Sequence, residues 1–195
     1  YKDKFLFDGM GRYDGSSKFG ENQRWHPYYR VSGAYRISQD LQIKGIDELK
    51  IRAAYGTAGI RPGYDWQYYR FTKVGNNPEP SQTGNPDLKP SNTAELEIGL
   101  NVDFLKKFNF EAIYAKSKTT DAFINQPLVG FLNNGYTNKW VNAASTESQT
   151  FEITLGANWF KNKDFSWSSN FVFSKINQKI TELNIPSYQA GPDGL

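Results

Sequence analysis

Two consecutive segments in which polar and apolar residues alternate most constrain what this chain can fold into. In the first segment, 93–104, every second residue is apolar and the residues between are polar, acidic or glycine. Side chains of a β-strand point alternately to opposite faces, so a strand here has one wholly apolar face. The apolar set is Ala94, Leu96, Ile98, Leu100, Val102 and Phe104, and the opposite set is Thr93, Glu95, Glu97, Gly99, Asn101 and Asp103.

The length of this segment favours a strand that crosses a membrane. Strands of globular proteins are usually about 5–6 residues long, whereas 93–104 is roughly twice that length. A tilted transmembrane strand needs about 9–11 residues. After a turn at Leu105-Lys106-Lys107 the alternation resumes at Phe108 and continues through 108–117, which predicts an antiparallel hairpin.

Five further segments alternate in the same way and predict more strands of the same sheet. If each strand pairs with its neighbour in sequence, the fold is all-β, an antiparallel up-and-down sheet forming part of a transmembrane β-barrel. The residues after Ile176 are predicted to be irregular. The seven predicted strands cover 5–13, 28–37, 49–56, 93–104, 108–117, 151–160 and 165–175.

The connections between the predicted strands differ in length in an alternating way. Loops at 57–92 and 118–150 are long, the turns at 105–107 and 161–164 are short, and 38–48 is shorter than the loop before it. A transmembrane barrel has long loops on one rim and short turns on the other, with aromatic girdles at both interfaces. One predicted girdle comprises Phe104, Phe108, Trp159, Phe160, Phe165 and Trp167, and the other comprises Tyr13, Tyr28, Tyr29, Tyr55 and Tyr114.

The same alternation predicts which side chains meet lipid and which line the lumen. A soluble β-sandwich, which also alternates and also buries aromatic residues, is the alternative fold. The long strands and the alternating loop lengths favour the barrel. The residues predicted to face lipid are Leu96, Ile98, Leu100, Val102, Phe110, Ile153, Leu155 and Phe171. Those predicted to face the lumen are Glu95, Glu97, Arg30, Arg36, Arg52 and Glu152.

The composition agrees with a membrane protein built from strands and disfavours several other classes. Hydrophobic residues make up 38% of the 195 residues and the mean hydropathy is −0.67. No apolar run approaches the roughly 20 residues of a transmembrane helix. The absence of cysteine excludes disulfides, thiolate metal sites and cysteine nucleophiles. A net charge of +3 is too small to indicate binding to nucleic acid.

Candidate catalytic and metal-binding groups are few. Glu95 and Glu97 share a strand face and could act as an acid–base pair, but a hydrated barrel wall also needs such residues. His26 is the only histidine, which gives a metal site or a catalytic triad little support. Gly9 and Gly11 lie inside a strand, without the helix that a phosphate-binding loop requires. We therefore expect no enzyme activity, cofactor or metal.

Aromatic residues in the predicted loops are the candidate binding residues. The cluster in 57–92 argues against disorder, because disordered segments are poor in aromatic residues. Such rings could stack on sugars or contact a partner protein, or they could pack against one another within the loops. The candidates are Tyr64, Trp66, Tyr68 and Tyr69 in this loop, with Trp25, Tyr136 and Trp140 in the other loops.

Several stretches resemble the SusC/RagA-type TonB-dependent outer-membrane transporters. The stretch from Arg12 to Gly20, RYDGSSKFG, is similar to the Arg-x-Asp-Gly-Ser-Ser-x-Phe-Gly signature of that family. DELKIRAAYG at 47–56 resembles the strand that follows a short turn. GNPDLKP at 84–90, followed by Thr93, Glu95 and Gly99, resembles the most recognisable barrel motif of the family. TTD at 119–121 and QPL at 126–128 resemble the loop beyond it.

The resemblance implies a piece of a plugged outer-membrane barrel of about 22 strands. It also implies uptake of oligosaccharides or peptides, a SusD-like surface lipoprotein as lid, and energy from TonB–ExbB–ExbD. No stretch of the chain matches the TonB box, the plug domain or the C-terminal strands of the family. We therefore expect residues 1–195 to be an internal barrel segment, since a barrel with two unpaired edges is not tolerated in lipid. The alternatives are a barrel serving adhesion, secretion or structure, and a soluble carbohydrate-binding β-domain.

Overall fold

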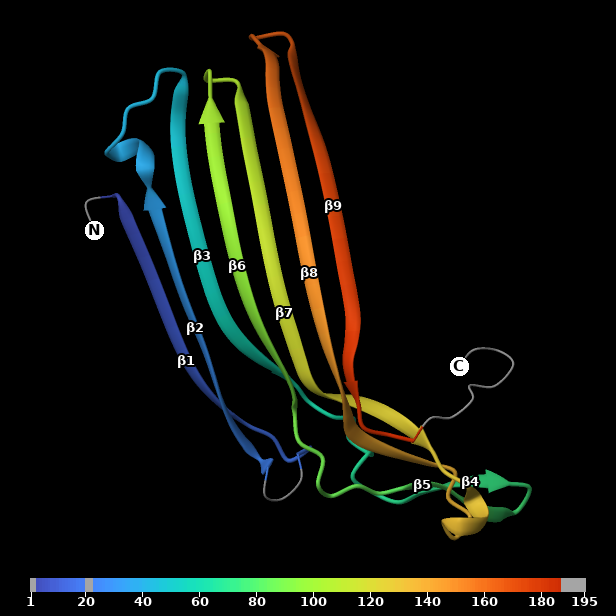
Figure 1. Cartoon of the computed structure of the whole chain (residues 1–195). Helices are drawn as coiled ribbons and strands as arrows, with labels where there is room; N and C mark the ends of the chain where they lie inside the picture. Colours follow the sequence, from blue (N-terminus) through green and yellow to red (C-terminus); the bar gives the residue numbers. More distant parts are fainter. Residues whose placement is uncertain (1–2, 20–22, 187–195) are drawn as a thin grey trace.

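A single curved sheet dominates the computed structural model, which describes residues 3–19 and 23–186 (Figure 1). Besides its strands, these residues form two short 3-10 turns, η2 (Ile37–Gln39) and η3 (Gly130–Leu132). None of the helical segments in the described ranges is long and apolar enough to cross a membrane. The long strands are β1 (Phe5–Gly15), β2 (Trp25–Arg36), β3 (Ile46–Ile60), β6 (Ser91–Phe104), β7 (Phe108–Pro127), β8 (Asn138–Lys161) and β9 (Ser166–Leu183).

The seven long strands pair antiparallel in chain order, as predicted. Strand β2 lies between β1 and β3, and β6, β7, β8 and β9 follow side by side. Two short strands, β4 (Arg70–Val74) and β5 (Asn77–Thr83), form a separate hairpin. This hairpin joins the sheet where β5 pairs parallel with the start of β8, through Gln82–Asn138 and Thr83–Lys139. We call the array of seven long strands the wall.

The register places the two predicted sets of side chains on opposite faces of the wall. Residues directly opposite in neighbouring strands point to the same face. One such row runs Val102–Phe110–Leu155–Phe171 and another runs Arg52–Gly99–Ile113–Glu152. The apolar face is uncovered, with Leu96 40%, Ile98 43% and Phe171 61% exposed. An uncovered apolar face is what a lipid-facing wall requires, and its contact with lipid remains a prediction.

Charged side chains on the polar face are paired across strands. The Arg52 guanidinium lies 3.0 Å from a Glu111 carboxylate oxygen and 3.5 Å from Glu97. Asn101 donates to the same Glu111 oxygen at 2.9 Å. A β-carbon at Gly99 would lie 2.4 Å from Nε of Arg52, so the glycine lets this arginine lie close over β6 without shifting. The further polar-face pairs are Arg36 with Glu48 and Arg30 with Asp8.

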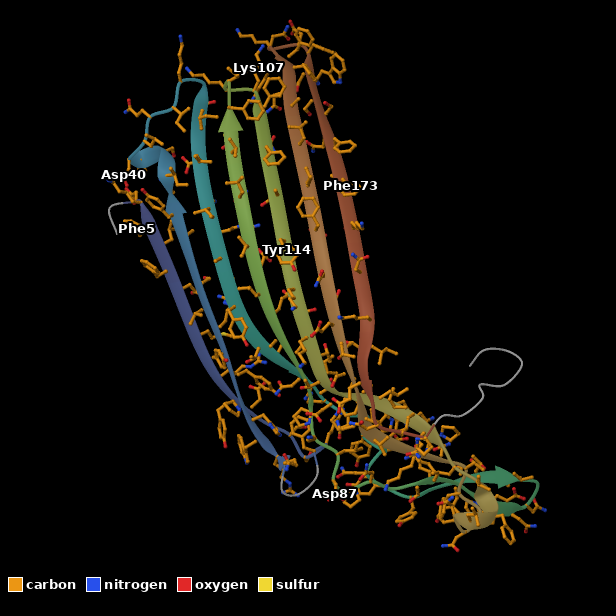
Figure 2. All side chains as sticks on the ribbon, viewed as in Figure 1. Phe5, Asp40, Asp87, Lys107, Tyr114 and Phe173 are labelled. Atoms are coloured by element: carbon orange, nitrogen blue, oxygen red, sulfur yellow. The ribbon has the colours of Figure 1, made fainter. Side chains whose placement is uncertain are left out.

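Aromatic rings gather at the short-turn rim, where Figure 2 labels Lys107. Phe104 stacks on Phe108 at 5.1 Å, and Trp159 meets Phe108 edge-on at 5.7 Å. Trp167 lies 6.2 Å from Trp159 and 6.1 Å from Phe160. Rings from β6, β7, β8 and β9 therefore form one continuous cluster at this rim, as the first predicted girdle requires.

The second predicted girdle is wrong for Tyr28. Its partner across the ladder is Arg12, and Arg30 lies on the same face two residues further along β2. Tyr28 therefore points to the polar face, where it is only 4% exposed and its ring lies 5.4 Å from the Arg12 guanidinium carbon. Tyr29 points the other way and lies 6.0 Å from Tyr55, as a girdle residue would.

Asp40 ties the connection between β2 and β3 to the start of β1. The Lys4 ammonium and the Tyr35 hydroxyl both donate to its carboxylate, the hydroxyl at 2.8 Å. These two hydrogen bonds, of which that from Lys4 has the larger effect, hold the pKa of Asp40 below its ordinary value.

The connections 16–24 and 37–45 are equal in length. The prediction that the connection between the second and third strands is shorter than the loop before it was therefore wrong.

The long loops are partly strand, which corrects the predicted boundaries. The segment 118–150, predicted to be a loop, consists largely of extensions of β7 and β8, and only 128–137 lies between them. The segment 57–92 contains the end of β3, the β4–β5 hairpin and the start of β6. The residues after Ile176, predicted to be irregular, continue β9 to Leu183. These extensions lack an apolar face, so alternation of hydrophobicity could not reveal them.

Strands β7 and β8 bend sharply where their extensions leave the wall (Figure 1). The register between them shifts from Thr119 to Ala122 and again at Phe123. Asp121, within this irregularity, has a left-handed backbone with φ of 56°. Extra residues in one strand of an antiparallel pair bend that strand and increase its twist. The bulge therefore redirects the hairpin out of the plane of the wall.

We predict that the two faces of β6 tolerate polar changes very differently. In the intact parent protein, Leu100→Arg is expected to destabilise the barrel by about 2–4 kcal/mol, because it places a charge against lipid. Glu97→Gln, on the polar face, is expected to cost much less. The free energy of unfolding of each variant is measured by titration with urea, with the folded fraction read from heat-dependent gel migration. Equal sensitivity at the two positions would contradict the assignment of the faces.

Candidate functional site

Beyond the bend, two chain segments fold together into a compact unit that we call the rim module, residues 62–90 and 121–142. Figure 1 shows the β4–β5 hairpin beside the tip of the β7–β8 hairpin, at the end of the wall opposite the short turns. The Thr137 amide donates to the Ser81 carbonyl at 3.0 Å, and the Thr137 hydroxyl donates to the same oxygen at 3.1 Å. These bonds extend the short parallel pairing of β5 with β8.

Stacked tryptophans form the centre of the rim module. Trp66 and Trp140 lie ring on ring at 3.6 Å with 7° between their planes, and Phe123 meets Trp66 edge-on at 5.2 Å. Leu88, from the GNPDLKP stretch, is fully buried at 0% exposure. A β-carbon at Gly63 would lie 2.4 Å from Nε1 of Trp66, so the chain passes close under this ring. Two predicted contact residues, Trp66 and Trp140, are therefore packed against each other.

Side-chain amides hold the turn that carries the tyrosines. The Asn85 side chain donates to the Trp140 carbonyl at 2.8 Å, while its own backbone amide donates to the Trp66 carbonyl at 3.2 Å. Gln82, only 4% exposed, donates to the carbonyls of Asp65 at 2.9 Å and Tyr68 at 3.3 Å. Buried amides that are bonded in this way fix backbone that no regular ladder supports.

The tyrosines of this turn remain open to solvent. Tyr64, Tyr68 and Tyr69 are 67%, 52% and 63% exposed. Tyr64 lies 6.1 Å from Tyr68, and Tyr136 lies 5.3 Å from Tyr69 and 6.0 Å from Phe71. We call Tyr64, Tyr68, Tyr69, Phe71 and Tyr136 the tyrosine surface. Tyr64, Tyr68, Tyr69 and Phe71 are exposed in the described part of the chain, whereas Tyr136 is half-buried, as are the two tryptophans.

The remaining predicted candidates lie apart from the rim module. Trp25 is 60% exposed and stacks on Tyr13 at 5.4 Å at the start of β2. Nε2 of His26 lies 2.8 Å from the Gln23 carbonyl, and its ring meets the buried Phe19 edge-on. Residues 3–19 and 23–186 contain no group of three or more side chains suited to hold a metal ion.

Sequence reasoning missed several residues that build the site. Phe123 and Asn142 fall in the long loop predicted for 118–150 and are not among its candidate residues, although one packs on Trp66 and the other bonds to the backbone of Lys89. Leu88 could have been singled out, since a lone aliphatic residue between two prolines in a polar stretch often marks a buried anchor. Phe71 gave no such signal. Gly20 of the RYDGSSKFG stretch lies outside the described residues.

The chain matches a known protein family over nearly its whole length. Residues 1–193 match the model of the TonB dependent receptor-like beta-barrel family. The chain belongs to this family, which is a family of receptors rather than of enzymes. The resemblance to SusC/RagA-type transporters inferred from the motifs is confirmed.

Curated relatives cover nearly the whole chain but extend far beyond it. TonB-dependent receptor P39 of Formosa agariphila is 30% identical over an alignment 193 positions long, gaps included, that covers 94% of this chain and 18% of that protein. TonB-dependent receptor SusC of Bacteroides thetaiotaomicron is 24% identical over an alignment 196 positions long, gaps included, that covers 92% of this chain and 20% of SusC. The chain therefore spans about a fifth of the length of these relatives.

Solved structures share the fold. The RagAB peptide importer in its closed-closed state superposes with a TM-score of 0.85 at 23% identity, over 98% of this chain and 22% of that chain. The siderophore receptor PirA of Pseudomonas aeruginosa gives a TM-score of 0.62 at 14% identity, over 91% of this chain and 34% of that chain. At these identities the likeness concerns the fold alone, and it confirms a segment of a TonB-dependent barrel.

We predict that Leu88 anchors the rim module. Leu88→Ala in the intact parent protein is expected to lower the free energy of local opening of the module by about 2–5 kcal/mol, because a fully buried leucine leaves a cavity. Protease cleavage within 128–137 should accelerate accordingly. Tyr68→Ala, which truncates an exposed ring, serves as the control and should leave cleavage nearly unchanged. Equal cleavage of both variants would show that Leu88 is not the anchor.

Proposed function

We propose that this chain is part of the barrel of a TonB-dependent importer in the outer membrane. The observation that carries the proposal is a wall with one uncovered apolar face and one charge-paired polar face, joined to an aromatic module at a single rim. A wall of this kind separates lipid from a hydrated lumen. The plug and the remaining strands of such a barrel belong, in this proposal, to a longer parent protein.

The relatives support import as the activity of that parent protein. SusC is named as a TonB-dependent receptor and RagAB as a peptide importer. Oligosaccharides or peptides are therefore the proposed substrates, and a SusD-like lipoprotein is the proposed lid. TonB–ExbB–ExbD is the proposed energy source. Binding, rather than chemical conversion, is the role proposed for the aromatic residues of this chain.

We propose the tyrosine surface as the part of this chain that contacts the substrate or the lid. Packing within the loops accounts for Trp66 and Trp140, which stack on each other, but not for Tyr64, Tyr68 and Tyr69, which stay more than half exposed. Rigid aromatic rings bury much area with little loss of rotamer entropy, and the phenolic hydroxyl adds a polar contact. Both properties suit a sugar ring and a protein lid.

The test is the combined replacement of Tyr64, Tyr68 and Tyr69 by alanine in the intact parent protein. Uptake or lid binding is expected to weaken by about tenfold or more, as for removal of exposed aromatic contacts at an interface. The amount of folded barrel, read from heat-dependent gel migration, should stay normal because these three rings are exposed and do not form part of a buried core.

Val74→Ala is the control, since Val74 ends strand β4, which follows the turn that carries the tyrosines, and is 53% exposed but stands outside the tyrosine surface. It should affect neither uptake nor lid binding. If the triple variant also transports and binds the lid normally, the tyrosine surface has no part in recognition.

A further inference from the structure

We propose that Asn142, with Lys89 and Asp121, locks the rim module to the wall and thereby sets the direction in which the tyrosine surface faces. These three are positioning residues rather than contact residues. They come from three separate stretches: the GNPDLKP stretch, the TTD stretch and the start of β8. What the positioned surface recognises rests on the proposed function above, whereas the lock itself rests on contacts within the chain.

The Asn142 side chain uses its donors and its acceptor on backbone groups. Nδ2 donates to the Asp121 carbonyl at 2.8 Å and to the Lys89 carbonyl at 2.9 Å. Oδ1 accepts the Lys89 amide at 3.1 Å. One amide group therefore joins β7, β8 and the segment that leads into β6.

These bonds replace ladder bonds that the bulge removes. The last β6–β7 pair of the wall is Asn92–Thr120, and the β7–β8 register skips Thr120 and Asp121. A backbone carbonyl left without a partner is costly when it is removed from water. The Ser91 hydroxyl donates to the Thr120 carbonyl at 3.3 Å, and Asn142 supplies the donor for Asp121. The lock thus sits where the wall ends and the module begins.

Lys89 and Asp121 also form an ion pair, at 2.8 Å between Nζ and Oδ1. Their side chains are 45% and 34% exposed. An ion pair that is so exposed to water contributes little to stability. Aspartate has a second use at this position, because it tolerates the left-handed backbone that Asp121 adopts. The geometry therefore assigns the larger share of the lock to the amide of Asn142 and the smaller share to the charges.

The lock is connected to the tyrosines through a short chain of contacts. Lys89 lies four residues after Asn85, whose side chain bonds to the Trp140 carbonyl and whose amide bonds to the Trp66 carbonyl. Trp66 lies between Tyr64 and Tyr68 in the turn. Segment 85–89 is therefore bonded to β8 at both Trp140 and Asn142, and a shift at one end displaces the turn at the other.

The distance between the module and the wall tests the lock directly. The chain has no cysteine of its own, so Lys73→Cys on β4 and Lys116→Cys on β7 allow spin labels to be placed on the intact parent protein in lipid. With the lock intact, the distance distribution should be narrow. Asn142→Ala should widen the distance distribution about twofold, because a segment that has lost these hydrogen bonds is free to move as a unit.

Three further variants separate the amide from charge and from general damage. Asn142→Asp keeps the shape but loses both donors, so it should broaden the distribution as Asn142→Ala does. Asp121→Asn removes the ion pair while keeping the backbone preference, so it should have little effect. Asn125→Ala, which truncates an exposed asparagine on the same hairpin, is the matched control and should have none.

Uptake separates failure of the lock from failure of the proposed function. With both intact, Asn142→Ala should raise the substrate concentration for half-maximal uptake about fivefold at an unchanged maximal rate, because preorganisation is lost. A distribution that stays narrow in Asn142→Ala overturns the lock, whatever uptake does. A broadened distribution with unchanged uptake supports the lock but contradicts recognition by the tyrosine surface.

Discussion

Backbone hydrogen bonding is the constraint on which the rest of this structure depends. A wall in lipid must satisfy every amide and carbonyl within itself, and long antiparallel ladders do so. From β3 to β9 those ladders also decide which side chain faces which way, since a slip of one residue would reverse every face. In the observed register Arg52 lies opposite Gly99, which leaves room for the arginine side chain over β6. Charge pairing on one face and bare apolar residues on the other both follow from this register.

A different set of bonds takes over where the ladder ends. At the bulge near Asp121 the strands bend, and side-chain amides rather than neighbouring strands satisfy the backbone. Asn85 and Asn142 join segments that are far apart in sequence, and the stacked rings of Trp66 and Trp140 fill the space between them. The rim module is thus held by a small number of specific contacts, whereas the wall is held by a repeating pattern. The proposed recognition surface lies in the part with the specific contacts, where single substitutions can alter shape without breaking the barrel.

This difference explains what could be predicted from the sequence. The wall strands were predictable because a half-apolar strand leaves a period of two, as in 93–104. The extensions of β7 and β8 have no apolar face, so they leave no such period. Strand β5 was also not predictable, because its residues Pro78 and Pro80 argue against a strand. The contact role of Tyr64 and Tyr68 stays a prediction. The stacking of Trp66 on Trp140 joins positions that no local pattern relates. The hydrogen bonds of Asn142 bring the GNPDLKP and TTD stretches together, which no pattern in the sequence indicates.

The most direct test of the account is the accessibility of spin labels placed one at a time along 94–103 in β6 of the intact parent protein in a lipid bilayer. Molecular oxygen concentrates in lipid and a neutral nickel chelate concentrates in water, so their collision rates with each label report its surroundings. We expect a period of two, with even-numbered positions such as Leu100 favouring oxygen and odd-numbered positions such as Asn101 favouring the chelate. Accessibility without this period, or with the two sets reversed, would contradict a wall that separates lipid from a hydrated lumen.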